Sequence, residues 1–426
     1  MIQATHESLE QKRKRRDTTE LLVVEDFMKA NTRPRGRKIL YFVVLGLACM
    51  VALEGMARIA TRGPRWLNPY YVEISGDFAD LDELIADSQN TQIALKYYDE
   101  FLYAAAPAST EHINFTDYYS ARLTPDSGPL SEAEHIIWTF GGSTMENTET
   151  TDRLTIANTW AQIFNGTLGP THVKNLGTGG FFSSYQLIKF QKLLREVPEN
   201  ELPTIAIFYD GYNDALFGFQ YGPGSLQEDL TLKLRALVEH ENVKIGTYAL
   251  SRTLSKYSRL WDWTAARLVE SLLFPLPEPN TEAANLDGAV RVYIRNVRMI
   301  QATCEVFQIR CFFVLQPLIV TKKPLTQLEQ EVLNELEGHP RFGSEGTQFV
   351  LEFYEKVIQE FADHEHFMDA SHILDGRTQS DFYDLGHTGA QTPPIIAEKI
   401  AYMILARLSL TTARMCPRVD SVLVDR

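Results

Sequence analysis

Cysteine is scarce in this chain: only 4 of its 426 residues are Cys, which excludes a small fold held together by several disulfide bonds. The cysteines do not have the spacing of a zinc site either, and we expect no metal ion. Positive charge is also in deficit, since 41 Lys and Arg against 55 Asp and Glu leave a net charge of −14. A protein that coats nucleic acid needs surplus Lys and Arg to bind phosphate, so we expect no nucleic-acid partner.

What the sequence does contain is the composition of a folded globular protein, with 44% hydrophobic and 23% charged residues. A length of 426 residues allows for about two or three domains, or one large domain with extensions. The charge is unevenly distributed. Residues 1–65 hold 13 Lys and Arg and 7 Asp and Glu, a net charge of +6, which leaves −20 for the other 361 residues.

One apolar stretch lies at the end of the basic region. Residues Ile39 to Leu53 carry no charge, and extension to Ala60 gives 22 residues, which as an α-helix would be about 33 Å long. That length matches a hydrocarbon core of about 30 Å, although the extension includes Glu54 and Arg58 near its end. We therefore predict one transmembrane helix at 39–60, with a buried core helix as the alternative.

Basic residues set the expected orientation of this helix. They are concentrated upstream, at Lys12–Arg16 and Arg33–Lys38, and membrane proteins retain such segments in the cytoplasm. We predict a single-pass membrane protein with a basic cytoplasmic tail (1–38) and with the rest of the chain outside the cytoplasm, in the periplasm if the source is bacterial. The alternative for Lys12–Arg16 is a nuclear or nucleic-acid patch.

The remainder of the chain is predicted to form one α/β domain with a parallel sheet, because short apolar runs alternate with helical periods over 134–410. A membrane-proximal lead (61–133) precedes this domain, an insertion interrupts it at 215–288, and a tail (411–426) follows. The predicted strands are His135–Phe140, Val173–Leu176, Thr204–Tyr209, Arg310–Leu315 and His366–Asp369, and the predicted helices are Ser184–Arg195, Ala289–Phe307, Thr347–Phe361 and Pro393–Leu408.

Polar and Gly-rich turns follow the first three strands and the last one. Each such turn is common by itself, but four in order that supply Ser, Gly, Asn and an Asp/His pair are rarely found together by chance. Because the carboxyl ends of parallel strands meet at one edge of a sheet, we expect these side chains to lie close together. The turns are Gly141–Met145, Asn175–Gly180, Asp210–Asp214 and Asp384–His387.

The residue types in these turns suffice for nucleophilic catalysis. Ser143 would be the nucleophile, exposed where a strand turns into a helix. His387 would be its general base, and Asp384, three residues earlier, would orient the imidazole ring. The backbone N–H groups of Ser143 and Gly180 and the side-chain amide of Asn213 would form an oxyanion hole, in which one donor is typically worth about 2.7–4 kcal/mol of transition-state stabilisation.

Together these residues resemble the SGNH, or GDSL-like, hydrolases over most of the α/β domain. Ser143 corresponds to block I, Gly180 to block II, Asn213 to the Gly-x-Asn-Asp motif, and Asp384 with His387 to the Asp-x-x-His motif. Block I reads Gly-Gly-Ser-Thr here instead of Gly-Asp-Ser-Leu, a frequent variant. The resemblance implies a flavodoxin-like three-layer α/β/α fold, activity on esters without a metal or cofactor, and in many members one N-terminal membrane anchor.

We therefore expect an extracytoplasmic serine esterase that is attached to the lipid bilayer through one helix. The expected substrate is an ester such as an O-acetyl group on an envelope glycan. Transfer of the acyl group to a glycan hydroxyl is one alternative, and a non-catalytic scaffold for polysaccharide assembly is another. Anionic headgroups would repel the acidic domain, which disfavours intact phospholipid as the substrate.

Some residues near these motifs allow a second interpretation. Asp369 to His372 is also an Asp-x-x-His sequence, but we prefer the later pair because it immediately precedes the C-terminal helix. Asp210 and Asp214 are more typical of loop and capping carboxylates than of catalysts. Cys304 and Cys311, seven residues apart, could form a disulfide outside the cytoplasm.

The roles of the aromatic residues near the expected site are open in the same way. Those that follow Gly180 could line an acyl or sugar pocket or pack in the core, and those of the insertion could contact sugar or the bilayer or pack with one another. The two Asn-x-Thr sequons matter only if the host glycosylates. The first aromatic group is Phe181, Phe182 and Tyr185, the second is Phe217, Phe219, Tyr221, Tyr257, Trp261 and Trp263, and the sequons are at Asn114 and Asn165.

Overall fold

The computed structural model describes residues 34–60, 68–93, 95–99, 104–107, 109–116, 119, 121–223, 236, 239, 241–275, 285–340 and 342–415. Most of the predicted cytoplasmic tail, including Lys12–Arg16, and most of the predicted tail 411–426 lie outside these residues. The chain divides into two compact units. We call Met1–Gly63 with Glu241–Leu273 the smaller unit, and Pro64–His240 with Phe274–Arg426 the larger unit.

A five-stranded sheet forms the centre of the larger unit. Its strands are β3 (His135–Gly141), β4 (Thr171–Asn175), β5 (Ile205–Asp210), β6 (Arg310–Leu315) and β7 (Phe367–Asp369). They pair in the order β4-β3-β5-β6-β7, and every pair is parallel. In chain order this is 2-1-3-4-5, which is the flavodoxin-like order. The predicted parallel sheet is thereby confirmed, and each predicted strand overlaps an observed one.

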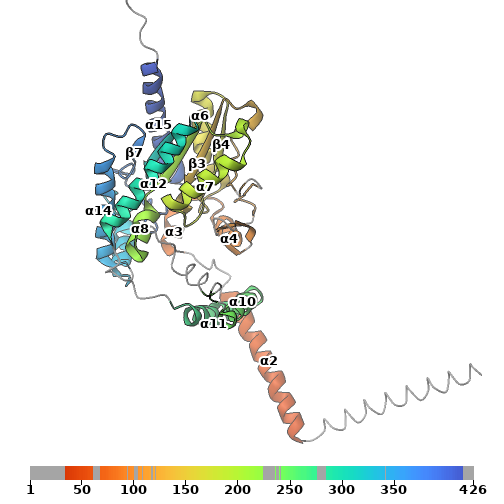
Figure 1. Ribbon diagram of the computed structural model, residues 1–426. Helices are drawn as coiled ribbons and strands as arrows, with labels where there is room; N and C mark the ends of the chain where they lie inside the picture. The colour runs from red at the N-terminus through yellow and green to blue at the C-terminus, as the bar shows by residue number, and fades with distance from the viewer. Residues whose placement is uncertain are drawn as a thin grey trace, which may run out of the picture. The chain divides into compact units, whose positions relative to one another are not determined.

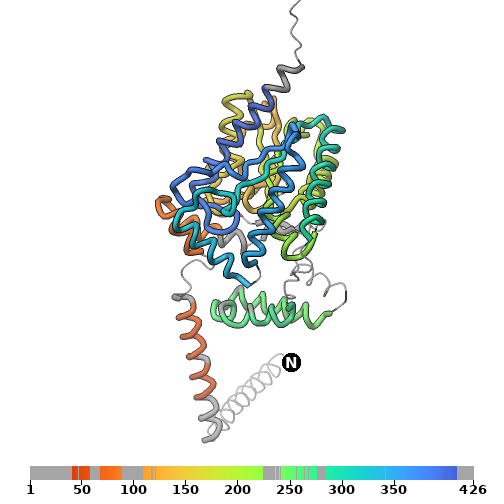
Figure 2. The backbone as a smooth tube through the Cα atoms, turned by 90° about the vertical axis from the view of Figure 1, so that its left-hand side faces the viewer, coloured from red at the N-terminus to blue at the C-terminus, as the bar shows by residue number. Residues whose placement is uncertain are grey.

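Helices cover both faces of this sheet (Figures 1 and 2), and consecutive residues of β3 and β5 are therefore buried. One face is covered by helices from the connections β4–β5, β5–β6 and β6–β7. The other face is covered by the helix that connects β3 with β4 and by the C-terminal helix. The first face carries α7 (Ser183–Glu196), α12 (Leu286–Val306) and α14 (Gly343–Glu360), and the second carries α6 (Ile156–Leu168) and α15 (Pro393–Met415).

Aromatic rings from neighbouring strands form the core on the first face. Phe140, Phe208 and Phe313 occupy matching positions on β3, β5 and β6, and their ring centroids are 4.9 and 5.5 Å apart. On the other face, the indole N–H of Trp160 in α6 donates to the backbone carbonyl of Ala397 in α15 at 2.9 Å. These contacts fix the strand ends in place, and with them the turns that carry the site.

The other elements of the larger unit are shorter. Two of its helices end the turns after β3 and β5, and a small antiparallel hairpin and two helices form the segment that precedes β3. These elements are α3 (Pro69–Ile74), α4 (Leu81–Ile93), β1 (Leu95–Asp99), β2 (Ala104–Pro107), α5 (Ser143–Glu146), α8 (Tyr212–Tyr221) and α13 (Gln327–Gly338), with single 3₁₀ turns at Leu130–Glu132, Asp152–Leu154 and Glu199–Glu201.

The smaller unit contains the helices α2 (Pro34–Ala60), α10 (Asn242–Tyr257) and α11 (Arg259–Leu273). The carboxylate of Glu54 in α2 joins them. It accepts hydrogen bonds from the backbone N–H groups of Arg259 (2.9 Å) and Leu260 (3.0 Å), at the start of α11. An acidic side chain is favourable there because it satisfies free N–H groups and the positive end of the helix dipole. Within the predicted insertion 215–288, α8 thus belongs to the larger unit and Glu241–Leu273 to the smaller one.

The structure does not support the predicted transmembrane helix at 39–60. In the part of the chain that the structure describes, no helix is long and apolar enough to cross a membrane. The uncharged part of α2 is only fifteen residues, and Glu54, which follows it, is held by the first turn of α11.

A buried ion network secures the loop that precedes α15. The ammonium group of Lys322 lies 2.7 Å from a carboxylate oxygen of Glu329 and 2.9 Å from one of Asp381, and none of the three side chains is exposed. The guanidinium of Arg377 contacts Asp381 from the other side, at 3.0 Å. Buried carboxylates are tolerated only when they are paired in this way. Asp381 lies three residues before Asp384, so this network fixes one end of the loop that carries the predicted Asp/His pair.

Candidate active site

The structure brings the three predicted catalytic side chains into one hydrogen-bonded line. Ser143 is the first residue of α5, directly after β3, and its Oγ lies 2.6 Å from Nε2 of His387. Nδ1 of the same imidazole lies 2.8 Å from Oδ2 of Asp384. The side chains of His387 and Asp384 are 19% and 29% exposed, so the line is open to a small molecule.

This line fixes which ring nitrogen of His387 carries the proton. Asp384 also accepts hydrogen bonds through Oδ1 from the backbone N–H groups of Gly386 (2.9 Å) and His387 (2.7 Å). In the neutral ring, a carboxylate held in this way accepts a hydrogen bond from Nδ1–H, which leaves Nε2 free to accept the hydroxyl proton of Ser143. The arrangement is that of a nucleophile, a base and an orienting acid.

Charge keeps the pair of Asp384 and His387 ionised against the effect of burial. Burial by itself would raise the pKa of Asp384, but the charge of His387 and the hydrogen bonds to the carboxylate outweigh it and lower that pKa. Burial would likewise lower the pKa of His387. The charge and hydrogen bond of Asp384, together with the nearby carboxylate of Glu149, instead raise it to about 9.

Asn213 and the segment of Gly180 meet beside the nucleophile. The side-chain amide of Asn213, in the first turn of α8, donates to the carbonyl of Phe181 at 2.7 Å. The same amide lies against Gly142, where a Cβ would approach its nitrogen to 2.5 Å, so a larger residue before Ser143 would require the side chain of Asn213 to shift. Gly180 has a φ of +76°, a conformation that favours glycine. Turns from β3, β4 and β5 thus converge, as the sequence predicts, and their role as oxyanion donors stays a prediction.

Two buried charged residues behind these turns, Glu146 and Lys189, could not be recognised from the sequence. The carboxylate of Glu146, at the end of α5, accepts a hydrogen bond from the backbone N–H of Gly179 at 3.0 Å. Burial raises the pKa of Glu146 to about 7, against the opposing charges of Arg122 and Lys189. The ammonium group of Lys189 donates to the carbonyl of Leu176 at 2.9 Å, within the same turn as Gly179. Glu146 thereby joins the nucleophile turn to the turn of Gly180.

Arg122 holds the other end of the nucleophile segment. Its guanidinium is buried, and it donates to the backbone carbonyls of Asn147 (2.9 Å) and Thr150 (2.9 Å) and to the carboxylate of Asp152 (2.7 Å). Burial lowers the pKa of Arg122, while Asp152 acts in the opposite direction. No sequence pattern connects Arg122 with a segment about 25 residues later, so the contact could not be inferred from the sequence.

The segment before β3 also reaches the site. The hydroxyl of Tyr71 donates to the carbonyl of Glu149 at 2.6 Å, and the hydroxyl oxygen of Ser75 accepts from the backbone N–H of Ala390 at 3.0 Å. The side-chain amide of Asn68 donates to the carbonyl of Tyr383 at 2.7 Å, directly before Asp384. The first part of the larger unit therefore braces both the nucleophile segment and the loop of Asp384 and His387.

The competing Asp-x-x-His sequence lies apart from this line. The side chain of His372 is 53% exposed, and its Nδ1 lies 3.2 Å from the carboxylate of Asp375. Asp369 accepts a hydrogen bond from the backbone N–H of Ser371 at 2.8 Å, as in a local turn. None of the contacts of His372 that the structure records involves Ser143.

The remaining candidates have partners of their own. Asp214 accepts hydrogen bonds from the N–H and hydroxyl of Ser183, and Asp210 accepts one from the hydroxyl of Tyr293 at 2.6 Å. The buried ring of Phe181 stacks on Tyr185 with centroids 5.0 Å apart, which is the packing alternative for this residue.

In the described part of the chain, no group of three or more His, Cys, Asp and Glu side chains is arranged to hold a metal ion.

Three comparisons with known proteins were made, and only the one with solved structures found similar proteins. No protein-family model matches the sequence, and no curated protein matches it. A lipolytic protein of the G-D-S-L family from Veillonella parvula is 11% identical, with a TM-score of 0.34 over 64% of this chain and 98% of that one. A psychrotrophic esterase from Pseudoalteromonas sp. is 10% identical, with a TM-score of 0.32 over 65% and 100%. An acetylxylan esterase from Geobacillus stearothermophilus is 9% identical, with a TM-score of 0.35 over 65% and 94%.

The chain is thus similar to solved GDSL-type lipolytic proteins and esterases. At identities of 9–11% and TM-scores of 0.32–0.35, the likeness assigns no activity to this chain. Membership of the SGNH family stays a prediction, and the chemistry has to be argued from the residues themselves.

The pKa of His387 provides a test of this geometry that needs no substrate. Asp384→Asn removes the negative charge that raises it, so we expect the pKa of His387 to fall from about 9 to the value of free imidazole, about 6.5, or below. Histidine ring resonances followed by NMR across pH 5–10 report the titration, and His387→Ala identifies the resonance. A pKa of His387 that is the same in the parent protein and in Asp384→Asn would contradict the ion pair.

The same shift predicts the sign of a stability change with pH. Because the pKa of His387 is higher in the folded state than the usual 6.5, the ion pair stabilises the fold fully below about pH 6.5. That contribution is lost as the pH rises through about 9. In Asp384→Asn this decline should disappear.

Proposed function

We propose that the larger unit is a serine ester hydrolase in which Ser143 is the nucleophile, His387 the general base and Asp384 the residue that orients it. The observation that carries this proposal is the hydrogen-bonded line from Ser143 Oγ through both ring nitrogens of His387 to Asp384. Its position supports the proposal as well. Ser143 and Asn213 follow β3 and β5, which are adjacent although β4 lies between them in sequence, and ligands of such sheets bind where the strand order reverses.

The proposed reaction has two displacement steps. Ser143 Oγ attacks the ester carbonyl carbon while its proton passes to Nε2 of His387, and the tetrahedral intermediate collapses as that proton is returned to the departing alcohol oxygen. Water then attacks the acyl–serine ester, with His387 again taking the proton, and the acid leaves as Ser143 recovers its proton. During each step the carbonyl oxygen carries negative charge, which the N–H groups of Ser143 and Gly180 and the amide of Asn213 would stabilise.

Glu146 has a positioning role in this proposal. Its carboxylate lies behind the turn that contains Gly180, and it holds the N–H of Gly179 rather than any reacting atom. A hydrogen bond to a charged acceptor is about twice as strong as one to a neutral acceptor. The orientation of the oxyanion donor at Gly180 should therefore depend on whether Glu146 is charged.

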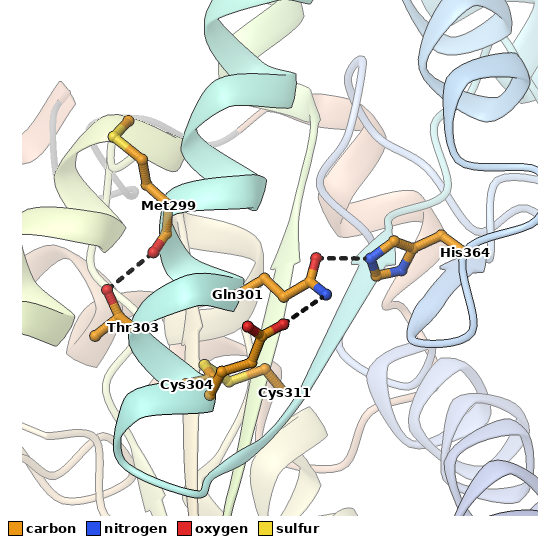
Figure 3. The surroundings of a disulfide bond; sticks show 7 residues. Met299, Gln301, Thr303, Cys304, Cys311 and His364 are labelled. Carbon is orange, nitrogen blue, oxygen red and sulfur yellow. Dashed lines mark hydrogen bonds between the residues drawn. A yellow bond between two sulfur atoms is a disulfide. The ribbon is translucent and has the colours of Figure 1, made fainter.

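For the substrate, we propose a short-chain ester such as an O-acetyl group on a glycan outside the cytoplasm. The disulfide supports the compartment: Cys304, near the end of α12, is bonded to Cys311 in β6 with their Cα atoms 6.2 Å apart (Figure 3). Structural disulfides persist mainly in oxidising compartments. Alkylation of free thiols in intact cells before lysis tests this, since modification of either cysteine would contradict an extracytoplasmic domain.

The nucleophile is tested with an activity-based probe. We expect a fluorophosphonate to label the parent protein at Ser143 and to leave Ser143→Ala unlabelled, because only an activated serine attacks phosphorus. Hydrolysis of p-nitrophenyl acetate should fall by about 10²–10⁴-fold in His387→Ala, which lacks the base. The exposed His372 provides the matched control, and His372→Ala should retain the parent rate.

Two results would overturn this assignment. Absence of labelling together with hydrolysis no faster than in Ser143→Ala would show a non-catalytic protein. Loss of hydrolysis in His372→Ala but not in His387→Ala would show that the other Asp-x-x-His pair supplies the base. Acetylated oligosaccharides and longer-chain esters, assayed with and without a glycan acceptor, then identify the acyl group and separate hydrolysis from transfer.

The role of Glu146 predicts a pH-dependent effect of its removal. Glu146→Gln keeps a hydrogen-bond acceptor but not the charge, so kcat/KM should fall by about 5–10-fold at pH 8.5, where the parent carboxylate is ionised. As the pH falls from 7 to 5.5 the parent carboxyl itself becomes neutral, and the two rates should approach each other. The ratio of parent to variant kcat/KM between pH 5.5 and 9 is the measurement, because titration of His387 largely cancels in it. A ratio that does not change with pH would leave Glu146 only a packing role.

A further inference from the structure

Most of the exposed large hydrophobic side chains of the described residues belong to the smaller unit. Among the described residues, 20 large hydrophobic side chains are exposed, and 15 of them belong to the smaller unit. Exposed apolar area that is concentrated in one place marks an interaction surface more often than single scattered residues do. Six of the 15 lie on α10 and α11, which pack against each other as a helical hairpin (Figure 1).

On each helix of the hairpin these side chains form one stripe. In α10, Val243, Leu250, Leu254 and Tyr257 are spaced by seven, four and three residues, which places them on a single face, and they are 82%, 60%, 37% and 70% exposed. In α11, Leu268 and Leu272 are four residues apart and 59% and 71% exposed. We call these six residues the hairpin stripe.

The charge of the hairpin is opposite to that of the chain. Residues 242–273 contain five Lys and Arg and two Asp and Glu, whereas the whole chain has a net charge of −14. A basic helix with an exposed apolar stripe and aromatic residues is the pattern of a helix that lies in the plane of a membrane surface. A second copy of the hairpin would carry the same positive charge and would be repelled, so charge complementarity favours an anionic partner.

We propose that the hairpin stripe binds the surface of a bilayer that contains anionic lipid. The apolar side chains of the hairpin stripe enter the boundary between headgroups and acyl chains, and the net positive charge of residues 242–273 attracts the anionic headgroups. Such helices lie along the surface, which is a different arrangement from a helix that spans it. Because Glu54 holds the start of α11, α2 is attached to the same surface through the smaller unit. This proposal does not depend on the reaction at Ser143.

A fluorescent probe at single positions of α10 tests the proposal on the full chain. The environment-sensitive dye NBD is attached to Leu250→Cys or Leu254→Cys, in a background with Cys49→Ser and Cys416→Ser and without reductant, so that the bond between Cys304 and Cys311 stays intact. Ala249→Cys is the matched control, since Ala249 is exposed on the same helix but lies about 100° around it from Leu250. Any attachment of the chain through other segments leaves these readings valid, because the dye reports only on α10.

We expect vesicles that contain phosphatidylglycerol to shift the emission of the Leu250→Cys and Leu254→Cys probes to shorter wavelength and to raise its intensity. The Ala249→Cys probe should change much less, and the shift should weaken with added salt or with vesicles of phosphatidylcholine alone. No shift at either stripe position would overturn the proposal, as would equal shifts at all three positions or in the two kinds of vesicle. Blue-shifted emission at Leu250→Cys before vesicles are added would show that protein already covers the stripe, and would also overturn it.

Discussion

The site depends on one hydrogen bond of 2.6 Å between two residues that are 244 positions apart in the chain, Ser143 and His387. Its two partners reach each other by different routes. Ser143 directly follows β3, which is paired on both sides, with β4 and with β5, whereas His387 lies in a loop without regular structure. The loop therefore needs support that a strand does not, and the buried pairing of Lys322 with Glu329 and Asp381 supplies it at one end. At the other end, the N–H of Ala390 is held by Ser75.

Charge is used in two ways around this bond. Near Asp384 and His387 the charged groups are partly exposed, and the carboxylate raises the pKa of His387 to about 9. Behind the turn of Ser143, Glu146, Arg122 and Lys189 are buried, and each of the three side chains holds a backbone group. Because a buried charge is costly unless it is satisfied, these three residues fix the turns more firmly than apolar packing alone would. The turns that contain Ser143 and Gly180 thus share one support.

Much of the sheet and most of the candidate site could be predicted from the sequence, for a physical reason. A buried parallel strand is a short apolar run that ends in a Gly-rich turn, and the order of such turns brings Ser143, Asn213 and His387 to one edge. Two missed helices did leave signals, since Thr155 caps α6 and the reciprocal bonds of Thr326 and Glu329 open α13. The contacts of Arg122 and Tyr71 left no such signal in the sequence. Both side chains donate to backbone carbonyls, and a backbone carbonyl requires no particular residue type. The role of Glu54 was not apparent either, because its partners at the start of α11 are backbone N–H groups, which every residue except proline has. Hydropathy alone suggested a membrane span that the structure does not support.

The hydrogen bonds of Asn68, Tyr71, Ser75 and Arg122 have a consequence for the evolution of this protein. A segment of this kind at the edge of a catalytic domain is usually free to be exchanged by recombination, since few of its contacts cross the boundary. Here the contacts that cross the boundary hold both the segment of Ser143 and the loop of His387. A recombination event between residues 122 and 135 would separate Ser143 and His387 from groups that hold them, even though every motif residue would be inherited. The segment before β3 and the domain that carries the motifs are therefore expected to be inherited together, and residues in contact across the boundary are expected to covary.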